Sequence, residues 1–571
     1  MRASAPRLTR TVVHIGPGQA AHWTRLRARR RLVRSVPVPS VTWSDCPGWP
    51  RGFHPADAAL TDHWPDAAEL RAGRFRLLGA TRDLGDSPDW TQPGESLLWR
   101  FHLHYWDWAW GLAADPDRLL ARAVFARLWR SWCEHARPGT GPGWLPYPAA
   151  LRAWSWCGLY AALVAGSDIE PAFTAELARH ASFVRSNLEY DLGGNHLIKG
   201  LKAAAGLGVF LADDRLLRLA VRRLASQLEI QVLPDGGHYE RAPAYHCQVL
   251  ADLTDLARLL EAAGHPVPGE LTRAIVRMRR FLGAVLGPDG RVPLRGDGYP
   301  VPPELIAGLG PVLPAAGAAL LLPDTGLARL AAHGWHVLAC VGDPGEPALA
   351  GHAHADTLSF FAWLDGHPVL VDTGTSTYEP GSARDYERST AAHNTIVIDG
   401  ANSTEVWGAF RAGRRARVHN VTTSTDSGTT SCAASHDGYR WRPGSPVHRR
   451  RWSLSADGLR VEDAVTGSGR HEVLLGWHLP PDSLLWLNPA SAGPSGQAIA
   501  ETETPAGALR VEVTSSAPVV LASATRPVAL GYQVAADAPV LTCRIDADLP
   551  VRVTTAWRRV AGHAPSSEGE A

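Results

Sequence analysis

The stretch LSFFAWLDGHPVLVDTG, residues 358–374, decides how the second half of this chain folds. It contains two short apolar runs that are separated by Asp365-Gly366. Runs of this length are typical of β-strands, and Asp-Gly is a strong hairpin turn. Similar runs follow in NTIVIDGANST, RRRWSLSADGLRVEDAV and LRVEVTSSAPVVLASA. We therefore expect an antiparallel β-sandwich or stacked sheets over residues 332–560.

The first half of the chain has a different period. Between about residues 116 and 286, apolar residues recur at helical spacing, as in DRLLARAVFARLWRSWCEHA and CQVLADLTDLARLLEAAG. Asp or Pro precedes several of these segments and Gly follows them, which indicates short connections and antiparallel neighbours. The pattern predicts stacked helical hairpins over residues 61–310, followed by a Gly- and Pro-rich junction at residues 311–331.

The overall class is therefore α+β and multidomain, since 571 residues exceed a single compact core. Residues 1–60 are predicted to be an N-terminal extension to which we assign no function, and its basic run TRLRARRRLVR is interpreted as a solvated face. Residues 561–571 are predicted to be a disordered tail.

Charge and composition exclude several classes of protein. Lysine and arginine number 57 against 56 acidic residues, which lacks the basic footprint of a nucleic-acid-binding protein. A mean hydropathy of -0.12 and the absence of a long apolar run argue against a transmembrane segment. The seven cysteines have no CxxC spacing, so no disulfide framework or thiolate metal site is predicted. No signal peptide is recognised, which favours a cytoplasmic location and leaves a periplasmic or secreted one open. Nothing predicts an oligomeric state.

Tryptophan is abundant, with 22 residues, many of them in WRFHLHYWDWAW (99–110) and WLPYPAALRAWSW (144–156). Flat aromatic faces suit the apolar faces of sugar rings, so Trp106 and Trp110 are candidate substrate-binding residues. The alternative is that these side chains pack between helices.

Polar residues that carry chemistry gather in GGNHLIKG (193–200), DGGHYERAPAYH (235–246), GHAHAD (351–356) and RSTAAHN (388–394). Asn195 and His196 follow two glycines at a predicted helix start, where an anionic group could be held. Pro243 marks another helix start and puts Tyr245 in its first turn. The remaining candidates for substrate binding in these stretches are His238, Glu240, Arg241 and Arg388.

A metal site is one interpretation of the remaining residues. His352 and His354 would lie on the same side of an extended strand. Asp372 and His393 follow at strand ends, 18 residues after His354 and 21 residues further on. Two imidazoles and a carboxylate are a usual zinc set. The alternative is that His354, Asp372 and His393 only form hydrogen bonds within the sheet.

Taken together, these motifs resemble the heparinase II/III family of polysaccharide lyases. GGNHLIKGLKA, DGGHYERAPAYH, LRGDG (294–298) and HAHADTLSF…VDTGTSTY…RSTAAHNTI follow that family's order and approximate spacing. The resemblance spans most of the chain. It implies an incomplete (α/α) toroid followed by an antiparallel β-sandwich, and cleavage of an acidic, uronate-containing polysaccharide by β-elimination.

The resemblance also implies roles for individual residues. Asn195, with His196 as a second candidate, would neutralise the substrate carboxylate, Tyr245 would be the base, the acid or both, and His352 would be the partnering acid or base. One structural zinc per chain would be held by His354, Asp372 and His393.

Lys199 departs from some family members, which carry an acidic residue three positions after the equivalent of His196, so the preferred uronate epimer is not predicted. Two other functions stay open. A toroid-fold glycoside hydrolase would use a carboxylate pair, with Asp235, Glu240 and Asp297 as candidates. A non-catalytic polysaccharide-binding or surface-polysaccharide assembly protein would keep the fold without turnover.

Overall fold

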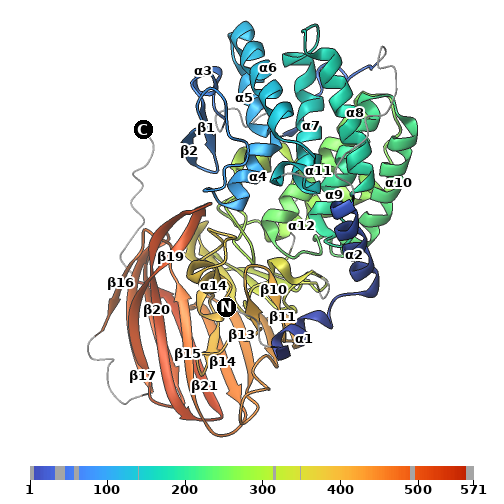
Figure 1. Ribbon diagram of the computed structural model, residues 1–571. Helices are drawn as coiled ribbons and strands as arrows, with labels where there is room; N and C mark the ends of the chain where they lie inside the picture. The colour runs from blue at the N-terminus through green and yellow to red at the C-terminus, as the bar shows by residue number, and fades with distance from the viewer. Residues whose placement is uncertain are drawn as a thin grey trace.

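The chain divides into a helical half and a sheet half in the computed structural model (Figure 1). The structure describes residues 5–32, 46–56, 64–138, 141–312, 317–346, 349–488 and 496–560. In these ranges the helical half is followed by antiparallel sheets, which confirms the predicted order of the two architectures. The predicted disordered tail, residues 561–571, lies outside the described residues.

The helical half is built from amphipathic hairpins. Its helices are α3 (Ala67–Arg71), α4 (Leu97–Tyr105), α5 (Trp110–Ala114), α6 (Arg118–His135), α7 (Pro146–Leu163), α8 (Glu170–Ser186), α9 (Gly194–Phe210), α10 (Asp214–Gln231), α11 (Pro243–Ala262), α12 (Gly269–Val285) and α13 (Pro303–Gly308). Asp117 and Asp213 cap α6 and α10 by accepting backbone N–H groups, as the Asp starts in the sequence predict. The two most buried helices are α9 and α11, and both begin at the motifs that carry the candidate residues.

The sheet half contains three main antiparallel sheets. The five-stranded sheet runs β3 (Ala319–Leu322), β4 (Leu327–Ala332), β5 (Trp335–Cys340), β6 (Phe360–Leu364) and β7 (His367–Leu370). The four-stranded sheet runs β19 (Val520–Gly531), β20 (Val534–Asp548), β15 (Arg470–His478) and β8 (Ile396–Ile398). The eight-stranded sheet runs β11 (Val418–Asp426), β12 (Thr429–His436), β13 (Val447–Ser455), β14 (Gly458–Thr466), β21 (Val551–Arg559), β18 (Gly507–Ser515), β17 (Gln497–Thr504) and β16 (Leu484–Leu487).

One apolar core joins these three sheets. Phe360, Trp452 and Leu475 come from the five-, eight- and four-stranded sheets, and all three side chains belong to the same buried cluster. The eight-stranded sheet therefore forms one layer and the two smaller sheets form the other. This is the layered arrangement that the period-two pattern predicts.

The domain boundaries differ from the prediction in two places. β3 and most of β4 lie within residues 311–331, which we had interpreted as junction, because the turn at Pro323–Gly326 interrupts a short apolar hairpin. Residues 64–96, assigned to the helical unit, include the two-stranded hairpin of β1 (Arg74–Leu77) and β2 (Ala80–Asp83). Both elements are too short for periodicity to reveal them.

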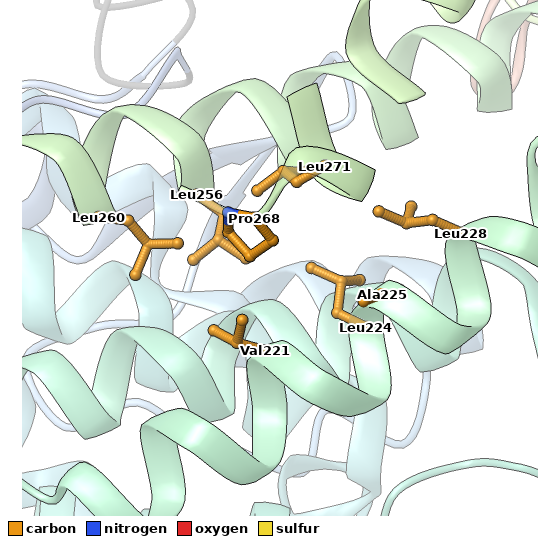
Figure 2. A pocket seen from close by; sticks show the side chains of 8 residues that line it. All are labelled: Val221, Leu224, Ala225, Leu228, Leu256, Leu260, Pro268 and Leu271. Atoms are coloured by element: carbon orange, nitrogen blue, oxygen red, sulfur yellow. The ribbon is translucent and has the colours of Figure 1, made fainter. Parts of the chain in front are cut away.

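An apolar hollow lies between α10, α11 and α12 (Figure 2). Its lining consists of Val221, Leu224, Ala225, Leu228, Leu256, Leu260, Pro268 and Leu271. Since none of these side chains has a polar group, the hollow is a packing feature between helices and offers nothing to an acidic sugar. No helix among the described residues is long and apolar enough to cross a membrane.

Part of the N-terminal extension bridges the two halves. It forms α1 (Ala5–Val12) and α2 (Pro17–Leu32), which run beside both halves in Figure 1. Arg10 binds Glu405 of the sheet half through its Nε and Nη2 atoms at 2.8 and 2.6 Å. Gln19 donates to the carbonyl of Asp191 in the helical half at 2.7 Å. The extension therefore ties the two halves together at the described residues.

We expect this tie to loosen in acid. The hydrogen bonds from Arg10 lower the pKa of Glu405 from 4.5 to about 2. A lowered carboxyl pKa adds stability that is present above pH 4.5 and is lost as the pH falls towards about 2. Hydrogen exchange of residues 5–12, corrected for intrinsic rates, should lose protection in this window. Glu405→Gln should show low protection already at pH 7, and equal protection in both proteins would contradict the assignment.

Candidate functional site

Asn195 is held against a buried carboxylate at the start of α9. Its backbone N–H donates to Glu240 Oε1 at 2.9 Å, and its Nδ2 atom lies 3.1 Å from both Glu240 oxygens. Gly194 has a positive φ of 54°, and a Cβ there would lie 1.8 Å from Glu240 Oε1, so only glycine fits. In the structure the carboxylate at this helix start is the protein's own Glu240, which is 4% exposed.

Tyr245 of the helical half contacts two residues of the sheet half. It lies in the first turn of α11, and its ring is 4.1 Å from the ring of His352 between centroids. Its hydroxyl is 3.0 Å from the hydroxyl of Tyr378, which comes from the loop after β7. His352 Nε2 lies 4.0 Å from Glu240 Oε2. Asn195 and His352 therefore meet at Glu240, and Tyr245 packs against His352. We call these residues with Tyr378 the interdomain site.

Asp297 organises the sheet side of the interdomain site. Its Oδ2 atom is 2.8 Å from His352 Nδ1 and accepts from Arg384 Nη2 at 2.9 Å, while its Oδ1 atom is 2.9 Å from His354 Nε2. Asp297, His354 and Arg384 are each 0% exposed. His352 lies in the short helical turn Ala350–His352 and not in a strand. His352 and His354 are on the same side because both bind the carboxylate of Asp297.

The surroundings shift the pKa values of these groups in different directions. Desolvation raises the pKa of Tyr245 well above 10, with contributions from Tyr378 and Asp297. Burial alone would raise the pKa of Glu240, but His352, His238 and Asn195 lower it overall. Burial would also raise the pKa of Asp297, yet Arg384 and the two histidines hold it well below its usual value. At neutral pH the phenol therefore carries its proton and both carboxyl groups are ionised.

His196 lies beside this group on the same helix turn. Its Nδ1 atom is 3.0 Å from Glu189 Oε2, and its ring lies 4.2 Å from the ring of Tyr147. Lys199, one turn further along α9, donates to Asp252 Oδ2 of α11 at 2.8 Å. His196 is half-buried, so its ring has an open side towards solvent.

The predicted metal ligands lie deeper than the interdomain site. His393 Nδ1 is 2.8 Å from Asp372 Oδ2, and the rings of His354 and His393 are 5.4 Å apart. They do not come from neighbouring strands, because Asp372 follows β7 of the five-stranded sheet and His393 precedes β8 of the four-stranded sheet. His354 Nδ1 and His393 Nε2 are buried, and neither has a hydrogen-bond partner among the residues that the structure describes.

These donors suit zinc in kind, since two unpartnered imidazole nitrogens lie beside a carboxylate. Within the described ranges, no three His, Cys, Asp or Glu side chains are placed closely enough to hold a metal ion as they stand. The side chains of His354, Asp372 and His393 would have to rotate to share an ion.

Four candidate substrate-binding residues are buried in the structure and contact the protein itself. Trp106 is 0% exposed and stacks on Trp90, and Trp110 is 5% exposed. His238 is 1% exposed and binds Gln231 behind Glu240. Arg388 is 1% exposed and donates to the backbone carbonyls of Ala353, Gly408 and Arg411.

The two other candidates for substrate binding also bind the protein itself. Glu240 faces Asn195, as described above, and Arg241 donates from Nη1 to the carbonyl of Asp343 at 2.6 Å. Arg241 has a positive φ of 58°, so its backbone turns sharply just before α11. Glu240 is buried, whereas Arg241 is half-buried.

Sequence reasoning missed Tyr378 and Arg384 as members of this region. Tyr378 ends the quoted motif VDTGTSTY, but nothing in the spacing indicates that its hydroxyl reaches α11. Arg384 lies in the short helix α14 (Ser382–Glu387) and is buried. Nothing in the sequence pattern of this segment indicates that its arginine is buried.

Comparison with known proteins identifies the family. A model described as "Heparinase II/III N-terminus" matches residues 93–307, and one described as "Heparinase II/III-like, C-terminal" matches residues 315–556. The chain belongs to the heparinase II/III-like family. The boundary between the two matches coincides with the change from helices to sheets, just before β3.

The chain is similar to two kinds of named protein, an FtsZ-localized protein and heparin-sulfate lyases. "FtsZ-localized protein C" of Caulobacter vibrioides is 28% identical over 419 residues, 70% of this chain and 70% of that protein. A "Heparin-sulfate lyase" of Pedobacter heparinus is 22% identical over 365 residues, 55% of this chain and 53% of the lyase. The crystal structure of heparinase III matches with a TM-score of 0.73 at 17% identity, covering 99% of this chain and 93% of that one.

The structural match shows that the fold is the toroid-plus-sandwich fold of heparinase III, as the sequence resemblance implies. Family membership supports a polysaccharide lyase that acts on a polysaccharide substrate.

Proposed function

We propose that this protein cleaves a uronate-containing polysaccharide by β-elimination. The reaction removes the C5 proton of a uronic acid, breaks the bond between C4 and the glycosidic oxygen, and forms a C4–C5 double bond. The observation that carries the proposal is that Asn195 and His352 meet at Glu240, while the ring of Tyr245 packs against His352. An amide, a phenol and an imidazole are the kinds of group that elimination requires.

Each residue has a part in this proposal. Asn195 stabilises the substrate carboxylate as charge develops at C5. For this contact its amide, which lies 3.1 Å from both Glu240 oxygens, turns towards the substrate. Tyr245 carries its proton at neutral pH, as an ordinary tyrosine does, and burial raises its pKa further. It is therefore available as the proton donor to the leaving oxygen. A role for Tyr245 as the base requires a neighbouring group to take its proton first. His352 is the partner for proton transfer, and His196 is the second contact for the carboxylate.

The test is the ultraviolet absorbance of the unsaturated uronate product. The wild-type protein is incubated with a panel of uronate polymers that includes glycosaminoglycans and alginates. A rise in absorbance is the expected result on at least one polymer. New reducing ends without such a rise would contradict elimination.

Zinc is part of the proposal as a structural ion. His354, Asp372 and His393 would hold it, and it would fix the loop that carries His352. The unpartnered His354 Nδ1 and His393 Nε2 atoms support this assignment.

We expect one metal ion per chain in the purified protein, measured by elemental analysis. His354→Ala should lower the metal content, while His333→Ala, a change at an exposed histidine, should leave it unchanged. A chelator should lower the thermal unfolding midpoint of the wild type more than that of His354→Ala. If wild-type protein has the same thermal unfolding midpoint with and without its metal, the structural site is refuted.

The hydrolase alternative has less support from the geometry. Its candidate carboxylates are already engaged, because Asp235 accepts from Thr325, Glu240 from Asn195 and Asp297 from Arg384. Glu240 and Asp297 are 4% and 0% exposed, and each is surrounded by the groups that donate to it. A pair of open carboxylates is what glycoside hydrolysis needs.

A non-catalytic role is the second candidate, favoured by the 28% identity to FtsZ-localized protein C. In this alternative the protein binds a polysaccharide or takes part in assembly at the cell surface without turnover. Binding of a polymer with no new double bond and no new reducing ends would support it over the lyase.

A further inference from the structure

The hairpin formed by β9 (Val406–Trp407) and β10 (Arg411–Ala412) presents a bare aromatic ring beside the interdomain site. Phe410 lies at its tip and is 48% exposed. Its ring is nearly parallel to that of Tyr378, at 14° and 5.9 Å between centroids. The hydroxyl of Tyr378 is 3.0 Å from that of Tyr245, so the ring of Tyr378 lies between Phe410 and the proposed proton donor, Tyr245.

Phe410 also lies against the segment that carries His352. A Cβ added at Gly351, the residue before His352, would lie 3.9 Å from the Cβ of Phe410. The Phe410 ring lies against Tyr378 and the guanidinium of Arg384, which is 5.5 Å from the ring centroid. Phe410 is nevertheless 48% exposed, so part of its apolar surface faces solvent.

Buried arginines fix the hairpin tip in place. Arg384 donates to the carbonyl of Ala409 from Nε and Nη2 at 3.1 and 2.8 Å. Arg388 donates to the carbonyls of Gly408 and Arg411 at 2.8 and 3.2 Å. Because these two arginines are 0% and 1% exposed, the backbone that carries Phe410 is anchored from inside the protein. An exposed ring on a fixed backbone can bind a ligand with little loss of conformational entropy.

We propose that Phe410 is a sugar-stacking residue of the substrate site, in contact with the apolar face of a sugar next to the cleaved bond. The proposal rests on the polysaccharide lyase function proposed above and deepens it. The predicted aromatic contacts, Trp106 and Trp110, are buried in the helical core, whereas Phe410 has an open face at the required place. Aromatic side chains offer large contact area to the C–H face of a sugar ring.

The test compares Phe410→Ala with two other variants on the polymer that the wild type cleaves. Phe410→Ala should raise KM about tenfold and leave kcat within about twofold, because it removes a binding contact and leaves the proton-transfer groups in place. Phe410→Trp should restore a KM close to the wild-type value. Trp486→Ala, at a side chain that is 50% exposed on β16, is the matched control and should leave KM unchanged.

A KM for Phe410→Ala equal to that of the control would overturn the stacking role while leaving the lyase function intact. If no polymer is cleaved, retardation in gels that contain each polymer separates the two proposals. Retardation of the wild type that is lost in Phe410→Ala would support the sugar contact and contradict elimination. Equal retardation of wild type and Phe410→Ala, or none on any polymer, would overturn the contact.

Discussion

Tyr245→Phe should lower the rate of elimination about 10³-fold, since a general acid or base contributes roughly 10²–10⁴-fold to such reactions. The change removes only the hydroxyl, which is 3.0 Å from the hydroxyl of Tyr378. The ring contact with His352 at 4.1 Å stays, so folding and substrate binding should be nearly unaffected. Initial rates of ultraviolet absorbance and the thermal unfolding midpoint measure both effects.

Tyr378→Phe is the graded comparison for this result. It removes the hydrogen-bond partner of Tyr245 and keeps the reacting phenol, so we expect a loss of about tenfold. A Tyr245→Phe variant with activity within about twofold of the wild type would remove Tyr245 from the mechanism. A stable variant that has lost polymer binding would assign Tyr245 to binding instead of proton transfer.

Asp297→Asn should lower the free energy of unfolding by about 4 kcal/mol, because it leaves the buried guanidinium of Arg384 without its charge partner. Asp297 and Arg384 are both 0% exposed, so solvent cannot replace the lost interaction. The variant also loses an acceptor for His352 and His354, and the activity should fall with the stability. Chemical denaturation and the ultraviolet assay measure the two losses.

The control is Asp365→Asn, which removes the charge of a carboxylate that pairs with Arg559 at the surface. Both side chains of that pair are more than half exposed, at 54% for Arg559 and 52% for Asp365. Exposed pairs of this kind contribute about 1 kcal/mol or less. Equal destabilisation by the two substitutions would contradict the role of Asp297 as the organising carboxylate.

Much of the fold could be predicted from the sequence because each half has a strong period of its own. The helical spacing in residues 117–136 and the hairpin at Asp365-Gly366 both correspond to observed elements, α6 and the turn between β6 and β7. Short elements were missed where a few apolar residues carry no period, as at β3 within the predicted junction.

Predicting the site from sequence was less complete, because burial depends on tertiary packing. The motifs brought Asn195, Tyr245 and His352 to one place, yet they did not indicate that Glu240 would be buried between them. Trp106 and Trp110 were candidates for sugar binding because composition alone does not distinguish an exposed tryptophan cluster from one that is buried between helices. Phe410 was not predicted because a single aromatic residue at a hairpin tip has no sequence pattern that marks it as a binding residue.

The most direct test of the central claim is the mass of the cleavage products from a uronate polymer. β-Elimination leaves a fragment whose new non-reducing end is an unsaturated uronate, and this fragment is lighter by one water than the product of hydrolysis. We expect the lighter, ultraviolet-absorbing fragment with the wild-type protein. Saturated fragments that have gained a water would contradict elimination and turn attention to hydrolysis.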